Sequence, residues 1–199
     1  MELKGKKILV VGAGKSGLAV SRFLSGKGAL AVLADANVPA CPSVELEQLE
    51  GAGVVVSLGG YPEVRRQAYD MVILSPGVPL TEGPARAAMK YGIALIGELE
   101  LAYLFATAPI VAITGTNGKT TTTTLIGEIF KREGRETLVG GNIGLPLVTE
   151  VERYGPEAVI VAEVSSFQLE TIRCFKPKVA VILNITPDHL DRHGNMAGY

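Results

Sequence analysis

Residues 110–121 read IVAITGTNGKTT, in which a run of apolar and β-branched residues leads into a glycine-rich turn. A helical pattern that contains Leu125, Ile126 and Ile129 follows the turn. A buried strand, a loop and a helix in this order are typical of phosphate-binding loops, because backbone N–H groups converge on an anion at a helix N-terminus. The segment therefore predicts a nucleotide-binding α/β unit.

Two side chains of this loop suit phosphate chemistry. Lys119 would place its charge at the β- and γ-phosphates, and the hydroxyl of Thr120 would bind Mg²⁺. The GxxxxGK[ST] pattern has its first glycine where Ile113 stands, so the loop is a variant. A glycine-rich turn with an accidental lysine is the alternative. The candidate nucleotide-binding residues are Gly115, Thr116, Asn117, Gly118, Lys119, Thr120 and Thr121.

Acidic and histidine residues follow two later strands. Glu163 ends the apolar strand predicted at residues 158–162, where P-loop enzymes carry an acid that holds Mg²⁺; a solvent-facing glutamate is the alternative. His189 and His193 have the spacing of a zinc-binding pair, but HExxH requires a glutamate where Leu190 stands. We expect His189 to contact a second Mg²⁺ or the substrate, with a solvated loop as the alternative, and assign no role to His193.

A second glycine loop, GAGKSG, covers residues 12–17, after a β-branched run. The GxGxxG pattern is typical of dinucleotide-binding folds, and Asp35 stands where a ribose-binding acid is expected. NAD, FAD or another diphosphate fits this pattern, as does tight packing without a ligand. The SPGV segment at residues 75–78 lines the same crevice or forms a simple turn. The candidate substrate-binding residues here are Gly14, Lys15, Ser16, Asp35, Ser75 and Gly77.

Strands and helical patterns alternate along the chain, which predicts parallel sheets covered by helices on both faces. Pro84 begins one helix and Ser43 caps another. We expect a Rossmann-like domain at residues 1–108 and an incomplete P-loop ATPase-type domain at residues 109–199. A small four-stranded domain is the alternative for the second region. The predicted strands are residues 8–11, 31–34, 54–58, 71–74, 93–96, 110–113, 137–139, 158–162 and 179–183.

The composition excludes several classes of protein. With 47% hydrophobic residues, 20% charged residues and a net charge of -1, the chain is not disordered and lacks the positive excess that nucleic acids or anionic membranes attract. Cys41 and Cys174 show no metal or disulfide spacing, so a cytoplasmic location is expected. No apolar run approaches the roughly 18 to 20 residues that cross a bilayer.

Four segments together resemble the Mur ligase family in order and spacing: residues 115–121, 141–144, 163–170 and 184–191. The GxGxxG loop of residues 12–17 with Asp35, the SPGV segment and especially the SSFQLE run of residues 165–170 are most similar to the branch that adds D-glutamate. The resemblance implies a monomeric three-domain enzyme for UDP-sugar, ATP and amino acid. This chain would hold the first domain and about half of the second.

The resemblance implies ATP-driven amide formation. The terminal phosphate would pass to the carboxylate of UDP-N-acetylmuramoyl-L-alanine, and the amine of D-glutamate would attack the acyl phosphate. The family's carbamylated lysine lies past the histidine segment, and no lysine lies between Lys178 and Tyr199, so we expect the 199-residue chain to be inactive alone. The implied roles are phosphate binding for Lys119, metal binding for Thr120, Glu163 and His189, and substrate binding for Asn142 and Ser165.

Two alternatives differ from this function. A folate-type or other amide ligase would share the phosphate loop but bind a different substrate. A nucleotide-binding switch or NAD module would lack ligase chemistry.

Overall fold

The computed structural model describes residues 1–38 and 44–199, so Cys41 and the predicted cap Ser43 lie outside the described residues. The chain divides into two compact units, Met1–Leu101 and Ala102–Tyr199. The division falls within helix α4, Glu98–Phe105, ahead of the boundary that the sequence places near residue 108. Each unit is described separately below.

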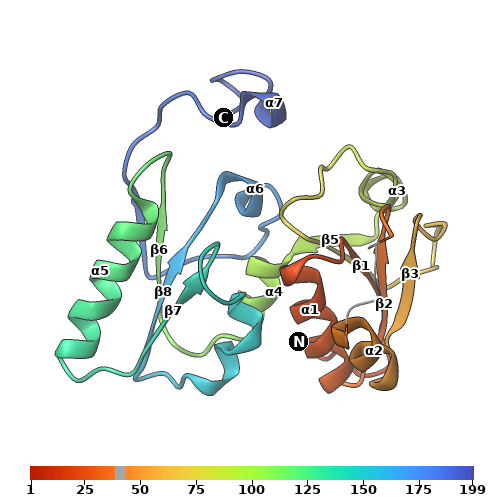
Figure 1. The fold of residues 1–199 in the computed structure, drawn as a ribbon, viewed down its shortest axis with the longest axis horizontal. Coiled ribbons are helices and arrows are strands. Elements are labelled where there is room, and N and C mark those ends of the chain that lie inside the picture. The colour runs from red at the N-terminus through yellow and green to blue at the C-terminus, as the bar shows by residue number, and fades with distance from the viewer. Residues whose placement is uncertain (39–43) are drawn as a thin grey trace. The chain divides into compact units, whose positions relative to one another are not determined.

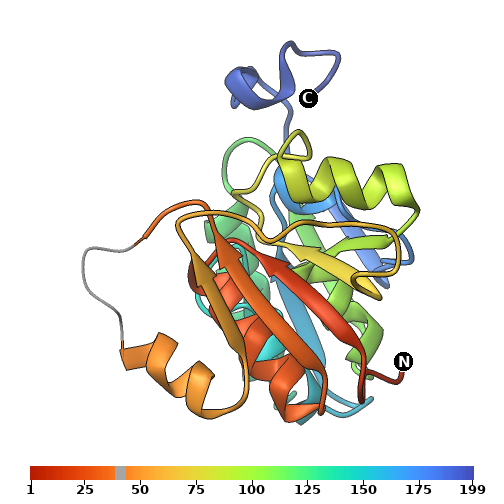
Figure 2. The ribbon, with the colours of Figure 1, turned by 90° about the vertical axis from the view of Figure 1, so that its right-hand side faces the viewer.

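The first unit contains a five-stranded parallel sheet in the order β3-β2-β1-β4-β5, seen obliquely in Figure 2. All five strands predicted in this unit are confirmed, with ends that differ by one residue at most. They are β1 Lys7–Val11, β2 Leu30–Asp35, β3 Val55–Leu58, β4 Met71–Leu74 and β5 Ala94–Gly97.

The helices of this unit are α1 Lys15–Gly26, α2 Val44–Gly51 and α3 Gly83–Tyr91. The chain winds outward from β1 in both directions, and right-handed crossovers therefore place α1 and α2 on one face and α3 on the other. On the α3 face, Leu9 and Val11 belong to one buried cluster with Ala85 and Ala88. The strand order reverses between β1 and β4, which is where doubly wound folds bind their ligands.

The second unit contains a four-stranded parallel sheet in the order β7-β8-β6-β9. Helix α5, Lys119–Arg132, covers one face (Figure 1). Its partly buried residues Ile126 and Phe130 pack on the strand cluster, whereas Leu125 and Ile129 are exposed. The four predicted strands are confirmed as β6 Ile110–Thr114, β7 Thr137–Gly141, β8 Val159–Glu163 and β9 Val179–Ile182.

Short helical segments complete the second unit. They are η1 Leu147–Thr149, η2 Val151–Arg153, α6 Ser166–Leu169 and α7 Leu190–His193. Because the strands are parallel, the loop after β6 and the ends of β7, β8 and β9 share one edge of the sheet. In the described parts of the chain, no helix is both long and apolar enough to span a membrane.

Candidate nucleotide and substrate sites

The predicted phosphate loop joins β6 to α5 at this carboxyl edge. Gly115 and Gly118 have φ angles of 138° and 83°, in the region that favours glycine. A Cβ atom on Gly115 would also lie 3.1 Å from the backbone nitrogen and oxygen of Asn184. Both glycines are therefore required by the backbone of the loop, whatever it binds.

Lys119 closes over this loop. Its Nζ donates hydrogen bonds to the carbonyl oxygens of Gly115, at 2.6 Å, and Thr116, at 2.9 Å. The first turn of α5 contains no acidic residue, and Thr121 in that turn is exposed. The ammonium group and the positive end of the helix dipole therefore combine at one point, an arrangement that favours an anion.

Three predicted residues from separate motifs meet beside the loop. The carboxylate of Glu163 is buried, with 2% of the residue exposed. Its Oε2 accepts a hydrogen bond from Thr120 Oγ1 at 2.8 Å, and its Oε1 accepts one from Asn142 Nδ2 at 2.9 Å. The alternative of a solvent-facing glutamate is thus wrong.

The turn after β7 is locked to the end of β8. Gly141 has a φ angle of 104°, and a Cβ atom there would overlap the carbonyl oxygen of Glu163. The N–H of Asn142 donates to that same oxygen at 2.9 Å. The glycine therefore allows Asn142 to approach the carboxylate.

The cluster of Thr120 and Glu163 fits a magnesium ion better than zinc. Hydroxyl and carboxylate oxygens are hard ligands, and Mg²⁺ commonly takes one or two of them and completes its shell with phosphate and water. Among the residues described, no group of three or more His, Cys, Asp or Glu side chains forms a cluster that could hold a metal. Any cation here would take its further ligands from bound phosphate and water.

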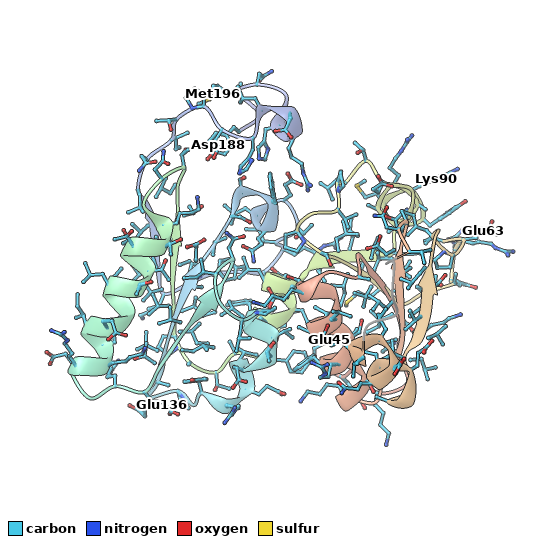
Figure 3. All side chains as sticks on the ribbon, in the orientation of Figure 1. Glu45, Glu63, Lys90, Glu136, Asp188 and Met196 are labelled. Atoms are coloured by element: carbon cyan, nitrogen blue, oxygen red, sulfur yellow. The ribbon has the colours of Figure 1, made fainter. Side chains whose placement is uncertain are left out.

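The segment after β9, which contains Asp188 and α7, lies beyond the same sheet edge (Figures 1 and 3). His189 directly follows Asp188 in this segment. It is the N-cap of α7, with a φ angle of 49°, and its ring lies 4.8 Å from the ring of Phe167. Its N–H donates to Asp188 Oδ1 at 2.9 Å. Within the described residues, no hydrogen bond joins His189 to Glu163 or Thr120, so the fold brings this histidine to the same edge without direct contact.

Helices α6 and α7 are held together by side chains. Arg192 donates to both carboxylate oxygens of Glu170, at 3.2 and 2.6 Å, and lies over the ring of Phe167. His193 Nε2 lies 3.0 Å from Ser166 Oγ. The hydroxyl of Ser165 accepts the N–H of Gln168 in a capping box, so this predicted substrate residue also begins α6.

In the first unit, the three glycines of GxGxxG differ in what requires them. Gly12 has a φ angle of 99°, and a Cβ atom on it would lie 2.8 Å from the Cβ of Ser75. A Cβ atom on Gly17 would overlap the carbonyl oxygen of Gly12. Gly14 has extended backbone angles and open space around it. The fold therefore requires Gly12 and Gly17 but not Gly14.

The other candidates of this unit surround that loop. Asp35 Oδ2 accepts the N–H of Ala13 at 2.7 Å, and its Oδ1 accepts the N–H of Asn37 at 2.8 Å, so Asp35 supports the loop directly. Ser75 Oγ donates to the carbonyl oxygen of Gly12 at 2.9 Å. Lys15 is exposed and Ser16 half-buried in the first turn of α1, and Gly77 is exposed in the turn after β4.

Tyr61 lies close enough to Asp35 and Glu82 to feel their charges, and no sequence motif singles it out. Burial raises the pKa of its phenol, and the negative charges of Glu82 and Asp35 raise it further. A tyrosine phenol is protonated at neutral pH even at its ordinary pKa, and the raised pKa extends this range to higher pH, so Tyr61 can donate a hydrogen bond. No sequence pattern marks it, because it follows β3 in an irregular segment.

Comparison with known families assigns both units. The Mur ligase middle domain matches residues 113–199, and the MurD-like N-terminal domain of Mur ligases matches residues 6–97. The chain belongs to the Mur ligase family. This confirms the family resemblance of the four motifs, and it gives each unit a family counterpart.

Curated Mur ligases align over nearly the whole chain. A UDP-N-acetylmuramoylalanine–D-glutamate ligase of Pelotomaculum thermopropionicum is 70% identical over 194 residues, which are 98% of this chain and 43% of that protein. A ligase of the same name from a Thermoanaerobacter species is 47% identical over 199 residues, 100% of this chain and 44% of that protein. The chain thus spans less than half the length of these relatives.

A solved Mur ligase structure supports the fold. The UDP-N-acetylmuramate-alanine ligase of Thermotoga maritima superposes with a TM-score of 0.55 and 22% identity, over 96% of this chain and 44% of that chain. The α/β fold class predicted from the sequence is confirmed. The roles of the individual site residues stay predictions.

Proposed function

We propose that these residues supply the UDP-sugar and ATP sites of an amide ligase that joins D-glutamate to UDP-N-acetylmuramoyl-L-alanine. Mur ligases are ATP-dependent, and the relatives reported above carry the name of this ligase. The observation that supports the proposal best is the meeting of Thr120, Asn142 and Glu163 beside Lys119. This arrangement suits the transfer of a phosphoryl group between two anions.

In the proposed reaction, the terminal phosphoryl group of ATP passes to the L-alanine carboxylate and ADP is released. The amine of D-glutamate then displaces phosphate and forms the amide. Lys119 would leave the carbonyl oxygens of its own loop and bind phosphate oxygens, which are stronger acceptors because they are charged. The loop N–H groups would bind the same phosphates.

Two cation positions belong to the proposal. Thr120 and Glu163 would hold Mg²⁺, which when bound would neutralise charge on the phosphates. Asn142 would donate to the substrate carboxylate through its Nδ2, which already faces an acid. His189 would serve a second cation or the substrate from the segment after β9.

The first unit would bind the UDP part of the substrate. Gly14 supports this assignment best. No neighbouring atom requires a glycine at this position, but a diphosphate bound close to the backbone would require one. Lys15 and Ser16 follow Gly14 in the loop. Asp35 and Ser75 bond to the neighbouring loop residues Ala13 and Gly12. We assign the UDP-sugar to residues 1–108 and ATP to residues 109–199.

The partners and the location follow from this proposal. Both substrates and ATP are small molecules, so neither nucleic acid nor a membrane takes part. We further propose that the intact enzyme acts as a cytoplasmic monomer.

A crossed binding experiment tests the proposal. The 199-residue chain and its Gly14→Val and Lys119→Ala variants are titrated with UDP-N-acetylmuramoyl-L-alanine, ATP with Mg²⁺, and NAD. We expect Gly14→Val to lower the affinity for the UDP-sugar about 10-fold or more. The affinity for ATP should not change, because the valine side chain enters only the first site. Lys119→Ala should do the reverse, since it removes a charged hydrogen bond to phosphate.

Each variant is thus the control for the other. Preferred binding of NAD over the UDP-sugar would overturn the assignment of the first unit. ATP binding that survives Lys119→Ala unchanged would show that the phosphates bind elsewhere.

A further inference from the structure

The segment that follows β9 lies beside the phosphate loop and forms hydrogen bonds with it through Asn184 and Thr186. The side chain of Asn184 accepts the N–H of Asn117 at 2.9 Å and donates to the carbonyl oxygen of Asn117 at 2.9 Å. The backbone oxygen of Asn184 accepts the N–H of Thr116 at 3.0 Å. One asparagine thus holds two consecutive residues of the loop.

Thr116 makes the next connection along the same segment. Its Oγ1 accepts the N–H of Thr186 at 2.9 Å and lies 3.1 Å from the carbonyl oxygen of Thr186, to which it can donate. Tyr199 places its hydroxyl 3.0 Å from the same Oγ1. The close approach at Gly115 belongs to this contact too, because the backbone of Asn184 occupies the space that a side chain would need.

These bonds orient the loop more than they stabilise the fold. Asn184 and Thr186 are exposed, so water can replace their partners and the net free energy of each bond is small. However, the peptide groups on both sides of Asn117 cannot rotate while the amide of Asn184 holds them. A phosphate-binding loop depends on such fixed N–H directions.

We infer that Asn184 is a positioning residue for phosphate binding, which fixes Asn117 in the loop and, with Thr116, couples the loop to the segment that leads to His189. This inference rests on the proposed function of the loop. Coupling is reciprocal, so phosphate on the loop also orders residues 184–190. The phosphate loop and residues 184–190 then become ordered together when phosphate binds.

The first test measures binding of ATP with Mg²⁺ by the 199-residue chain. Asn184→Leu keeps the size of the side chain but removes both amide bonds, and Thr116→Val removes the hydroxyl. Each substitution should lower the affinity for ATP about 10-fold, because that is the effect of losing one or two hydrogen bonds. Thr116→Ser restores the hydroxyl and should recover most of the ATP affinity that Thr116→Val loses.

Matched controls come from the same unit. Among the described residues, the side chain of Asn195 accepts the N–H groups of Ala197 and Gly198, both in its own turn. Thr137 Oγ1 donates to the carbonyl oxygen of Arg135. Asn195→Leu and Thr137→Val should therefore leave ATP affinity unchanged. If either control lowers the affinity for ATP as much as its counterpart does, the loss does not depend on contacts with the phosphate loop, and the inference fails.

The second test needs no ligand. Amide hydrogen exchange of residues 115–119 should become at least about 10-fold faster in Asn184→Leu, because the N–H of Asn117 loses its acceptor, while exchange in β6 stays unchanged. Unchanged exchange in the loop would overturn the inference even if ATP binds as proposed. Failure of the unchanged protein to bind ATP would instead remove the proposed function, and the exchange result would still decide whether Asn184 positions the loop.

Discussion

At the scale of single residues, Glu163 combines burial with charge. A buried carboxylate is costly unless it is hydrogen-bonded, and here each of its oxygens has a donor, Thr120 on one side and Asn142 on the other. Those donors come from the phosphate loop and from the turn after β7. The residue therefore joins three strand ends and places its carboxylate oxygens beside the phosphate loop.

Replacing Glu163 with glutamine should separate charge from shape. Glu163→Gln keeps the size of the side chain and an acceptor for Thr120, so we expect the free energy of unfolding to change by only about 1 kcal/mol. The gain in ATP affinity on adding Mg²⁺ should fall about 10-fold, because the cation loses a charged ligand. Titrations with ATP in the presence and absence of Mg²⁺ measure this gain.

Glu136→Gln is the control, because Glu136 is an exposed residue just ahead of β7 in the same unit (Figure 3). It should keep the full effect of Mg²⁺. An equal effect of Mg²⁺ in Glu163→Gln and in the unchanged protein would place the metal elsewhere.

At the scale of elements, α5 rests on β7 through a glycine. A Cβ atom on Gly127 would overlap Cγ2 of Val139, so the helix can lie this close to the strand only without a side chain at that point. Helix propensity alone would favour alanine over glycine by roughly 1 kcal/mol. Packing and propensity therefore oppose each other at this residue.

We expect packing to dominate in Gly127→Ala and to lower the free energy of unfolding by about 1 to 3 kcal/mol. Urea denaturation measures this change. Gly26→Ala, at the end of α1 where a Cβ atom meets nothing, should be neutral or slightly stabilising. Adding Val139→Ala to Gly127→Ala should recover part of the loss, and strict additivity of the two changes would contradict a contact between them.

At the scale of the whole molecule, each unit has its own parallel sheet and its own buried cluster. A ligand stabilises the part of a protein that binds it, by about 2.7 kcal/mol at a concentration 100 times its dissociation constant. The two proposed ligands should therefore protect different halves of the chain.

Hydrogen exchange should show ATP with Mg²⁺ slowing exchange in residues 102–199 and UDP-N-acetylmuramoyl-L-alanine slowing it in residues 1–101. NAD is the control and should slow neither at the same concentration. Equal protection of both halves by either ligand would contradict separate sites.

The strands and both glycine loops could be predicted from the sequence because their causes are local. β-branched runs favour strands, and positions such as Gly115 and Gly118 need backbone angles that only glycine adopts easily. Sequence alone could not tell why a particular glycine is there. Gly12, Gly14 and Gly17 share one motif, yet neighbouring atoms exclude a side chain at the first and third only.

Tertiary structure decided which residues meet in the site. Thr120 reaches Glu163 because β8 lies next to β6, and Asn184 reaches Asn117 because β9 lies on the other side of β6. No local pattern encodes that strand order, since it depends on which crossover buries the most apolar surface. The motifs could therefore be read one by one from the sequence, while their meeting at one sheet edge required the packed fold.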